Sequence, residues 1–379
     1  MIYLDNSATT WVLPQVAETV NYYMTENFFN PSSAYTAAVN VEHDVNAARQ
    51  RLATLFGATP EEIIYTSGGT ESNNMAIFGS LHALRNKGEI ICGATEHPSV
   101  YEVFKSLIQQ GYTVKFAPVT ESGELDLDAF RALLSDKTQF ISLMHVNNET
   151  GAVNDIAYCK KLINENAKNA IFHVDGVQAF AKLPFSRVPC DFYSISGHKL
   201  HAPKGVGALF VRKGTKFLGG QIGGGQERDL RSGTTNVPGI MGLDKAISIY
   251  SENQAKIIAD MNRIKTQLIS RLLGMNDVII NSPLKNFSAP HIINTSFLGV
   301  RGEVLLHSLA DSGICVSTGS ACSTHKKGSR VLSSMGIDGE RLLGAIRISI
   351  CPYTTSDEID IACDNIETII TKLRKYKRR

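Results

Sequence analysis

A lysine that follows an apolar stretch is the most reactive group that the sequence suggests. Residues Phe192 to Ile195 predict a buried strand, and Ser196-Gly197-His198-Lys199 comes next, ahead of a turn that contains Gly205 and Gly207. Ligands bind at strand ends in α/β sheets, and a lysine held there among apolar groups has a lowered pKa, which favours imine formation. A surface lysine in a β-turn fits this stretch equally well, so the choice depends on the rest of the chain.

Polar groups follow three other predicted strands. The turn from Thr66 to Glu71 places Gly69 and Thr70 at a helix start, where backbone N–H groups can hold a phosphate. Asp175 ends an apolar strand, where a buried carboxylate is costly unless it meets a cation. His97 lies just beyond the predicted strand 89–92. Each has an ordinary structural alternative: a glycine turn, a helix N-cap and a structural histidine.

These groups together match the needs of one cofactor, pyridoxal 5′-phosphate. Its aldehyde needs a lysine, its phosphate needs a helix start, and its protonated pyridine nitrogen needs a fixed anion that keeps the ring an electron sink. Lys199, the turn at Gly69 and Asp175 supply these groups, and His97 supplies an aromatic plate. The sequence therefore predicts a pyridoxal 5′-phosphate site at the strand ends of one sheet.

The elements that must position these groups alternate between strands and helices over the first two thirds of the chain. This rhythm predicts a mostly parallel sheet covered by helices. The expected strands are 62–66, 89–92, 113–116, 140–144, 171–174, 192–195 and 208–212, and the expected helices are 14–27, 34–56, 72–86, 100–110, 127–134 and 156–166.

The last third of the chain has a different pattern. A long helical region is expected from Val237 to about Leu273, after which short strands at 278–281, 294–297 and 345–349 separate helices at 303–311 and 357–376. This pattern predicts a smaller α+β domain. We place a large cofactor-binding domain at residues 14–245 and a small domain at residues 1–13 and 246–379.

Composition and charge limit the function classes. The chain has 379 residues, of which 43% are hydrophobic and 20% charged, with no apolar run long enough for a membrane span and no basic, apolar leader at the start, so we expect a cytoplasmic protein. Seven cysteines without a CxxC pair argue against a disulfide framework or a zinc site. The C-terminal KLRKYKRR is basic, but a solvated helix end explains it better than direct nucleic-acid binding.

Several motifs carry a resemblance to a known family. Ser196 to Lys199, followed after five residues by Gly205-Val206-Gly207, resembles the cofactor-lysine signature of class V aminotransferases. With other motifs the whole chain is similar to cysteine desulfurases of the NifS/IscS type, whose fold is that of the pyridoxal 5′-phosphate transferases of fold type I. These motifs are Tyr3 to Thr10, Thr66 to Asn74, His145 to Gly151, His173 to Asp175, Arg231 to Thr234 and Gly319 to Cys322.

The resemblance implies roles around the cofactor ring. Lys199 would form the Schiff base, and Asp175 would pair with the pyridinium nitrogen. Gln178 and Asn148 would contact the ring O3′ and its neighbourhood, while His97 would stack on the ring and move protons.

The resemblance also implies the phosphate site and the assembly. The phosphate ligands would be Gly69, Thr70, Ser196 and His198, with Thr234 reaching over from a second subunit. The expected protein is therefore a homodimer.

Two residues would bind the substrate, which the resemblance identifies as L-cysteine. Arg347 matches the family's bidentate clamp on the substrate carboxylate, and a planar guanidinium suits that task. Asn6 is expected beside it.

Cys322 would decide the reaction. It lies in a polar loop, and neighbouring His325, Lys326 and Lys327 would favour the thiolate. A loop thiol without a function is the alternative from spacing alone. The resemblance makes Cys322 the nucleophile that takes sulfur from cysteine as a persulfide and leaves alanine, with Lys199 moving the Cα proton.

The sulfur acceptor is less determined. The resemblance implies an acceptor protein, either an iron–sulfur scaffold or a tRNA-thiolation enzyme, and the basic residues after Cys322 together with the basic tail motivate the second. The segment Phe29 to Tyr35 departs from the family's usual glycine and histidine near the substrate mouth.

Other functions stay open. A selenocysteine lyase or another pyridoxal 5′-phosphate lyase or aminotransferase of the same fold would need no catalytic thiol. A regulatory protein that kept only the fold is the alternative outside enzymes.

Overall fold

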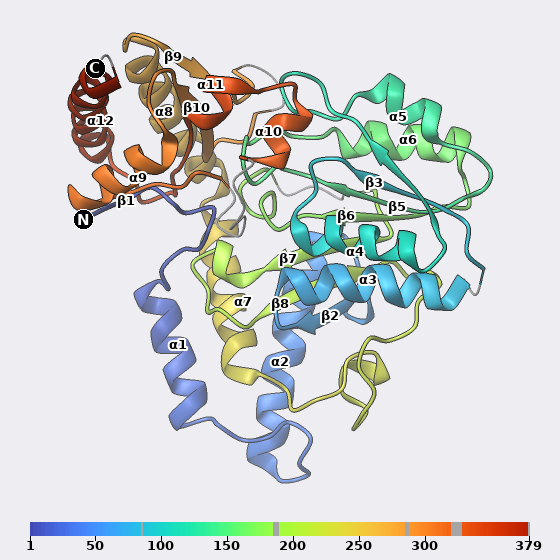
Figure 1. Cartoon of the computed structure of the whole chain (residues 1–379). Helices are drawn as coiled ribbons and strands as arrows, with labels where there is room; N and C mark the ends of the chain where they lie inside the picture. The colour runs from blue at the N-terminus through green and yellow to red at the C-terminus, as the bar shows by residue number, and fades with distance from the viewer. Residues whose placement is uncertain (85, 185–188, 285–287, 320–327, 378–379) are drawn as a thin grey trace.

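The computed structural model describes residues 1–84, 86–184, 189–284, 288–319 and 328–377, and a seven-stranded sheet lies at its centre (Figure 1). The strand order is β2-β8-β7-β6-β5-β3-β4. All neighbouring pairs are parallel except those of β8, which runs antiparallel to β7 and to β2. The expected mostly parallel sheet is confirmed. Its strands are β2 (Ile63–Thr66), β3 (Glu89–Gly93), β4 (Thr113–Ala117), β5 (Thr138–Met144), β6 (Ile171–Asp175), β7 (Phe192–Ser196) and β8 (Gly207–Val211).

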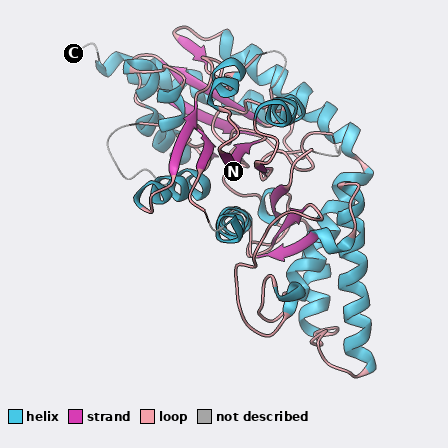
Figure 2. Ribbon diagram, turned by 90° about the vertical axis from the view of Figure 1, so that its right-hand side faces the viewer, coloured by secondary structure: helices cyan, strands magenta, loops and turns pink. Residues whose placement is uncertain are grey.

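Helices cover both faces of this sheet (Figure 2). Successive residues of a strand point to opposite faces, and here the residues on both faces are apolar, so each face needs a covering layer. Ile90 and Phe140 belong to one buried cluster, and the next residues, Ile91 and Ile141, belong to the other. The first cluster includes α3 (Gly69–Leu84) and α4 (Pro98–Gln109). The second includes α2 (Thr36–Leu55), α5 (Leu127–Leu133), α6 (Ile156–Asn166) and α7 (Val237–Glu252), and α1 (Pro14–Thr25) packs on α7.

A second, three-stranded antiparallel sheet follows in the last third of the chain, with the order β12-β10-β9. Helices α8, α9 and α12 pack around it, and β1 from the N-terminus joins β11 in a parallel pair (Figure 1). The strands are β1 (Ile2–Tyr3), β9 (Val278–Ile280), β10 (Ile292–Phe297), β11 (Ile314–Cys315) and β12 (Ala345–Ser349), and the helices are α8 (Gln254–Leu273), α9 (Gly302–Asp311), α10 (Arg330–Ser334), α11 (Gly339–Leu343) and α12 (Ser356–Lys377).

The helical region expected between Val237 and Leu273 is two helices. Asn253 takes φ −122° and ψ 14°, which interrupts the helix between α7 and α8. The first helix packs against α1 and α2, whereas the second packs on β9 and β10 of the small sheet. In the parts of the chain that the structure describes, no helix combines the length and apolarity that a membrane span requires.

Candidate active site

One cavity of about 330 Å³ lies at the carboxyl edge of the large sheet. Strands β3, β5, β6 and β7 run in one direction, and β2 runs with them because both β2 and β7 are antiparallel to β8. Their carboxyl ends therefore meet at one edge. The expected site residues that line the cavity are Gly69, Thr70, His97, Asn148, Asp175, Gln178, Ser196, His198, Lys199 and Arg347.

Lys199 ends the short 3-10 helix Gly197–Lys199, which continues directly from β7. Its Nζ donates hydrogen bonds to the carbonyl oxygens of Ser7, at 2.6 Å, and Ala8, at 2.7 Å. Burial, followed by the positive charge of Arg347, lowers the pKa of Lys199 to about 8. A fraction of this lysine is therefore neutral, and nucleophilic, near neutral pH.

Asp175 is the last residue of β6; it lies in the cavity wall, and the residue as a whole is 5% exposed. Asn73 Nδ2 donates to Oδ2 at 2.8 Å, and the Val177 N–H donates to Oδ1 at 3.0 Å. No cation pairs with it among the described residues. A carboxylate has about four acceptor positions, so the two bonds hold Asp175 in place and leave room for a cationic ligand. Asn73 lies within the motif Thr66 to Asn74, but its spacing did not distinguish it as the partner of Asp175.

The start of α3 forms the phosphate end of the cavity. A Cβ on Gly69 would lie 2.6 Å from Val177 Cγ2, which is too close for a larger residue. Glycine therefore lets the backbone at the helix start lie next to the cavity. The first N–H groups of a helix have no partner within it and attract anions. His198 lies nearby, where burial and the charge of Lys199 lower its pKa to about 3. It is therefore a neutral ring, and its Nδ1 lies 3.1 Å from Thr9 Oγ1.

His97 caps α4 and is exposed to the cavity. Its Nδ1 accepts a hydrogen bond from the Ser99 N–H at 3.1 Å. The neutral ring consequently carries its proton on Nε2. This fixed orientation suits an aromatic plate that also exchanges a proton.

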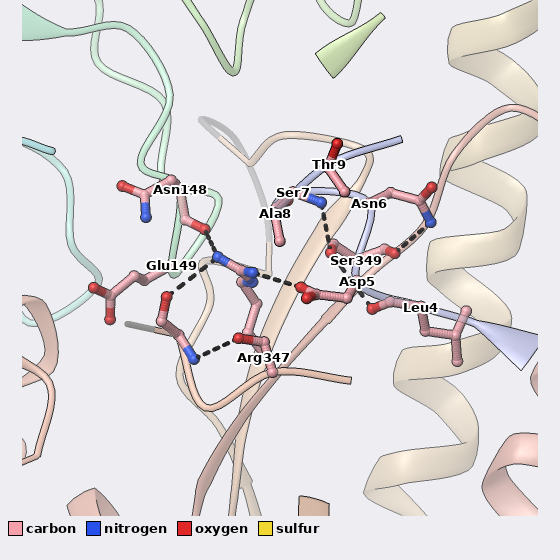
Figure 3. Close-up of polar contacts among 12 residues, drawn as sticks. Leu4, Asp5, Asn6, Ser7, Ala8, Thr9, Asn148, Glu149, Arg347 and Ser349 are labelled. Atoms are coloured by element: carbon pink, nitrogen blue, oxygen red, sulfur yellow. Dashed lines mark hydrogen bonds and ion pairs between the residues drawn. The ribbon is translucent and has the colours of Figure 1, made fainter. Parts of the chain in front are cut away.

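Arg347 comes from β12 of the small sheet and meets the large sheet's loops in the cavity (Figure 3). Its Nη2 pairs with Asp5 Oδ1 at 2.6 Å, and its Nη1 donates to the Asn148 and Gly319 carbonyls at 2.9 and 3.3 Å. The buried Nε has no partner among the described residues. The guanidinium is thus held in place at the cavity wall, and a substrate carboxylate that binds it would compete with Asp5.

Two other expected residues, Asn6 and Thr234, do not line the cavity. Asn6 is buried, and its Nδ2 donates to the Tyr3 carbonyl. It also donates to the Ser349 carbonyl (Figure 3). Thr234 is exposed on the surface of this chain. Cys322 lies outside the described residues, although Gly319, three positions before it, lines the cavity.

Glu149 also belongs to the cavity wall, and the sequence had not singled it out. Its Oε2 accepts a hydrogen bond from Ser329 Oγ at 2.5 Å, and burial raises the pKa of its carboxyl group. Glu149 lies within the motif His145 to Gly151, but nothing in the spacing of that motif indicated that its side chain lines the cavity.

The donor set fits pyridoxal 5′-phosphate. A lysine with a lowered pKa, an anchored carboxylate with unused acceptor positions and a glycine-lined helix start occupy different sides of one cavity. These are the groups that the aldehyde, the pyridine nitrogen and the phosphate each require. The cavity volume is within the usual range for small-ligand sites.

Comparisons with known proteins extend over nearly the whole chain. The family model described as aminotransferase class V matches residues 2–361. A cysteine desulfurase from Nostoc sp. is 43% identical over 378 residues, which cover 99% of this chain and 94% of the relative. The cysteine desulfurase IscS of Klebsiella pneumoniae is 40% identical, with 99% and 94% covered. A solved NifS-like protein is 36% identical, with a TM-score of 0.92 and 98% and 99% of the two chains covered.

Proposed function

This chain belongs to the aminotransferase class V family, and we propose that it is a pyridoxal 5′-phosphate-dependent cysteine desulfurase. It takes sulfur from L-cysteine, releases L-alanine and carries the sulfur as a persulfide on Cys322. The observation that carries this proposal is the cavity that joins Lys199, Asp175 and Arg347 and is lined by Gly319, where the segment with Cys322 begins. Desulfurase relatives at 40 and 43% identity support it.

The cofactor's protonated ring withdraws electrons from the substrate Cα when it is bound. Lys199 Nζ would hold the cofactor and, as a free amine, would remove the Cα proton of the substrate. Asp175 would hold the ring nitrogen protonated, and His97 would cover the ring. Gly69, Thr70, Ser196 and His198 would bind the phosphate.

Sulfur transfer is the task of Cys322. Its thiolate Sγ attacks the substrate sulfur, and a new S–S bond forms while the substrate C–S bond breaks. The electron pair of the broken bond stays on the carbon fragment, which is protonated to alanine. Arg347 meanwhile fixes the substrate carboxylate, in competition with its pairing to Asp5.

Assembly, location and the sulfur acceptor are further parts of the proposal. The enzyme is a homodimer in which Thr234 serves the partner's phosphate site, and it works in the cytoplasm. Six cysteines are free in the described part of the chain, in keeping with a reducing compartment. The persulfide passes to an iron–sulfur scaffold or to a tRNA-thiolation protein. Transfer rates to one acceptor of each kind would distinguish them.

Mass spectrometry after addition of cofactor and cysteine tests the proposal. Under nonreducing conditions the peptide that contains Cys322 should gain one sulfur, with alanine released. Cys322→Ala should keep the yellow cofactor and lose nearly all desulfurase turnover, whereas the control Cys315→Ala should keep both. Absence of the sulfur adduct in the wild type would overturn the proposal. Full turnover in Cys322→Ala would favour a lyase that needs no thiol.

A further inference from the structure

Lys182 is a buried lysine close to the proposed cofactor site. It is 4% exposed, and among the described residues no carboxylate lies within ion-pair distance of it. Burial, followed by repulsion from Lys199, lowers its pKa to about 7. A methionine would fill the same space without the cost of burying an amine. This cost suggests that the amino group has a task.

The backbone directs Lys182 inward by an uncommon conformation. Ala181, the residue before it, takes φ +63°, in the left-handed region that residues other than glycine rarely adopt. The Lys182 N–H bonds the Ala179 carbonyl at 3.0 Å, which closes a tight turn after β6. Strained positions of this kind are held by their surroundings and often accompany functional sites.

The Lys182 amino group faces Gln178, which lines the cavity. Lys182 Nζ lies 3.4 Å from Gln178 Oε1, and His291 Nε2 lies 3.4 Å from the same oxygen. On the other side, Gln178 Nε2 donates to the Ser7 carbonyl at 3.0 Å. An ammonium group can only donate and a carbonyl can only accept, so these neighbours allow one orientation of the amide. The second N–H of Nε2 is then the free end of the side chain.

We propose that Lys182 is a positioning residue that fixes the Gln178 carboxamide so that its N–H, and not its carbonyl oxygen, faces the cofactor O3′. This inference rests on the proposed function, since it assigns Gln178 to the cofactor ring. A donor at O3′ stabilises the ring oxygen as an anion. It therefore lowers the pH at which the yellow, protonated form of the bound cofactor converts to its near-ultraviolet form.

Other titratable groups lie around Lys182, and the variants below leave them in place. Lys199 and Cys351 interact with it electrostatically, and Lys182 in turn lowers the pKa of His291, His198 and His201. Loss of the Lys182 cation removes positive charge near the cofactor. Loss of charge and loss of the oriented donor both raise the pKa of the cofactor band, so a double-mutant cycle is needed to separate them.

The test is a pH titration of the visible band in the purified holoenzyme. Lys182→Met should raise the pKa of the band by roughly 0.5 to 1 unit, the equivalent of one net hydrogen bond. Gln178→Ala should give a similar rise. Because Lys182 acts through Gln178, the double variant should rise no further than Gln178→Ala alone.

Lys265→Met is the matched control. Lys265 is also a buried lysine, with its pKa lowered to about 8, but its Nζ bonds Ser288 Oγ and the Ala289 carbonyl instead of Gln178. Its removal should leave the band unchanged. Lys182→Arg keeps a group that can only donate and should restore the wild-type pKa.

Three results would overturn the inference: an unchanged band in Lys182→Met, an equal shift in Lys265→Met, or fully additive shifts in the double variant. Gln178→Glu gives an independent check if Lys182→Met does not fold. Its carboxylate should pair with Lys182 and keep the melting temperature, while the band pKa rises. A marked fall in melting temperature would contradict the contact. A wild type with no visible band would instead refute the proposed function.

Discussion

At the scale of single residues, two opposing effects act on the Lys199 amine. Two carbonyl acceptors, from Ser7 and Ala8, favour its charged form, whereas burial and the Arg347 cation favour its neutral form. The second pair prevails, since the pKa falls to about 8. The N-terminal segment therefore orients the amine without preventing its deprotonation.

Cofactor capture by the apoprotein should depend on pH accordingly. The amine is a cation below its pKa and a nucleophile above it, so the capture rate should rise with pH to a midpoint of about 8. Arg347→Gln removes a neighbouring positive charge and should move this midpoint to higher pH. Stopped-flow absorbance measures the rate. A rate that is independent of pH would contradict the assignment, and Lys199→Ala, which should form no reducible bond to the cofactor, is the control.

Substrate binding should depend on the shape of the Arg347 side chain as well as its charge. Arg347→Lys keeps one positive charge but loses the planar fork, so KM for cysteine should rise about tenfold or more, with a smaller change in kcat. Steady-state alanine release measures both constants. An unchanged KM would show that the carboxylate binds elsewhere.

The sequence predicted which residues near strand ends line the cavity. Asp175 and Lys199 were predictable because a polar residue after an apolar strand has few structural uses. The pairing of Asp5 with Arg347 was not, because the two residues are 342 positions apart and only the tertiary fold brings them together. The hydrogen bonds from Lys199 to two backbone carbonyls were not predictable either, because every residue has a carbonyl group and its type does not show which one is used.

At the scale of elements, the sequence predicted the strands better than their directions. Side chains alternate with a period of two residues whichever way a strand runs, so this period does not reveal that β8 is antiparallel to its neighbours. The connection from Ser196 to Gly207 is shorter than the dozen residues that a parallel crossover needs, and this length was the available signal.

The segment before α7 has an unusual backbone. Glu227, Arg228 and Asp229 take φ of 47°, 58° and 62°, all in the left-handed region. Glu227 stabilises this conformation by a two-pronged pair with Arg49 of α2, at 2.6 and 2.7 Å, and by accepting the Tyr65 N–H at 3.0 Å. These contacts tie the segment that leads to Thr234 to α2 and to β2 of the large sheet.

Breaking this pair should destabilise the protein. The side chains of Arg49 and Glu227 are 9% and 8% exposed, so Glu227→Gln leaves a buried charge without its partner and should cost about 3 kcal/mol of unfolding free energy. The matched control is Glu303→Gln, which breaks the exposed Arg301 pair and should cost less than about 1 kcal/mol. Urea denaturation measures both. Equal losses in the two variants would argue against a structural role for Glu227.

At the scale of the whole molecule, a buried acid makes stability depend on pH. Glu96 Oε1 accepts the Met144 N–H at 2.5 Å, and Oε2 has no partner among the described residues. Burial, followed by the charge of Asp175, raises the Glu96 pKa well above its ordinary value of 4.5. The folded protein therefore binds this proton more tightly than the unfolded chain.

Replacing Glu96 with Gln should remove that dependence. Because the folded pKa is raised, the stability that Glu96 contributes is present below pH 4.5 and is lost progressively as the pH rises above it. The variant should gain on the wild type from pH 5 to pH 8, by on the order of 1 kcal/mol or more. Urea denaturation at several pH values gives the difference. A difference that stays constant with pH would contradict a neutral Glu96.

The N-terminal segment bonds both to the small sheet and to Lys199, and these contacts affect when the site forms during biosynthesis. Leu4, Asn6 and Ser7 bond Ser349 of the small sheet, while the carbonyls of Ser7 and Ala8 bond Lys199, which follows β7 of the large one. During translation the first residues leave the ribosome long before Ser349 is made. The cofactor site is therefore completed only after the C-terminal part of the chain has been synthesised and has folded, so cofactor uptake is a late event and a measure of a finished chain.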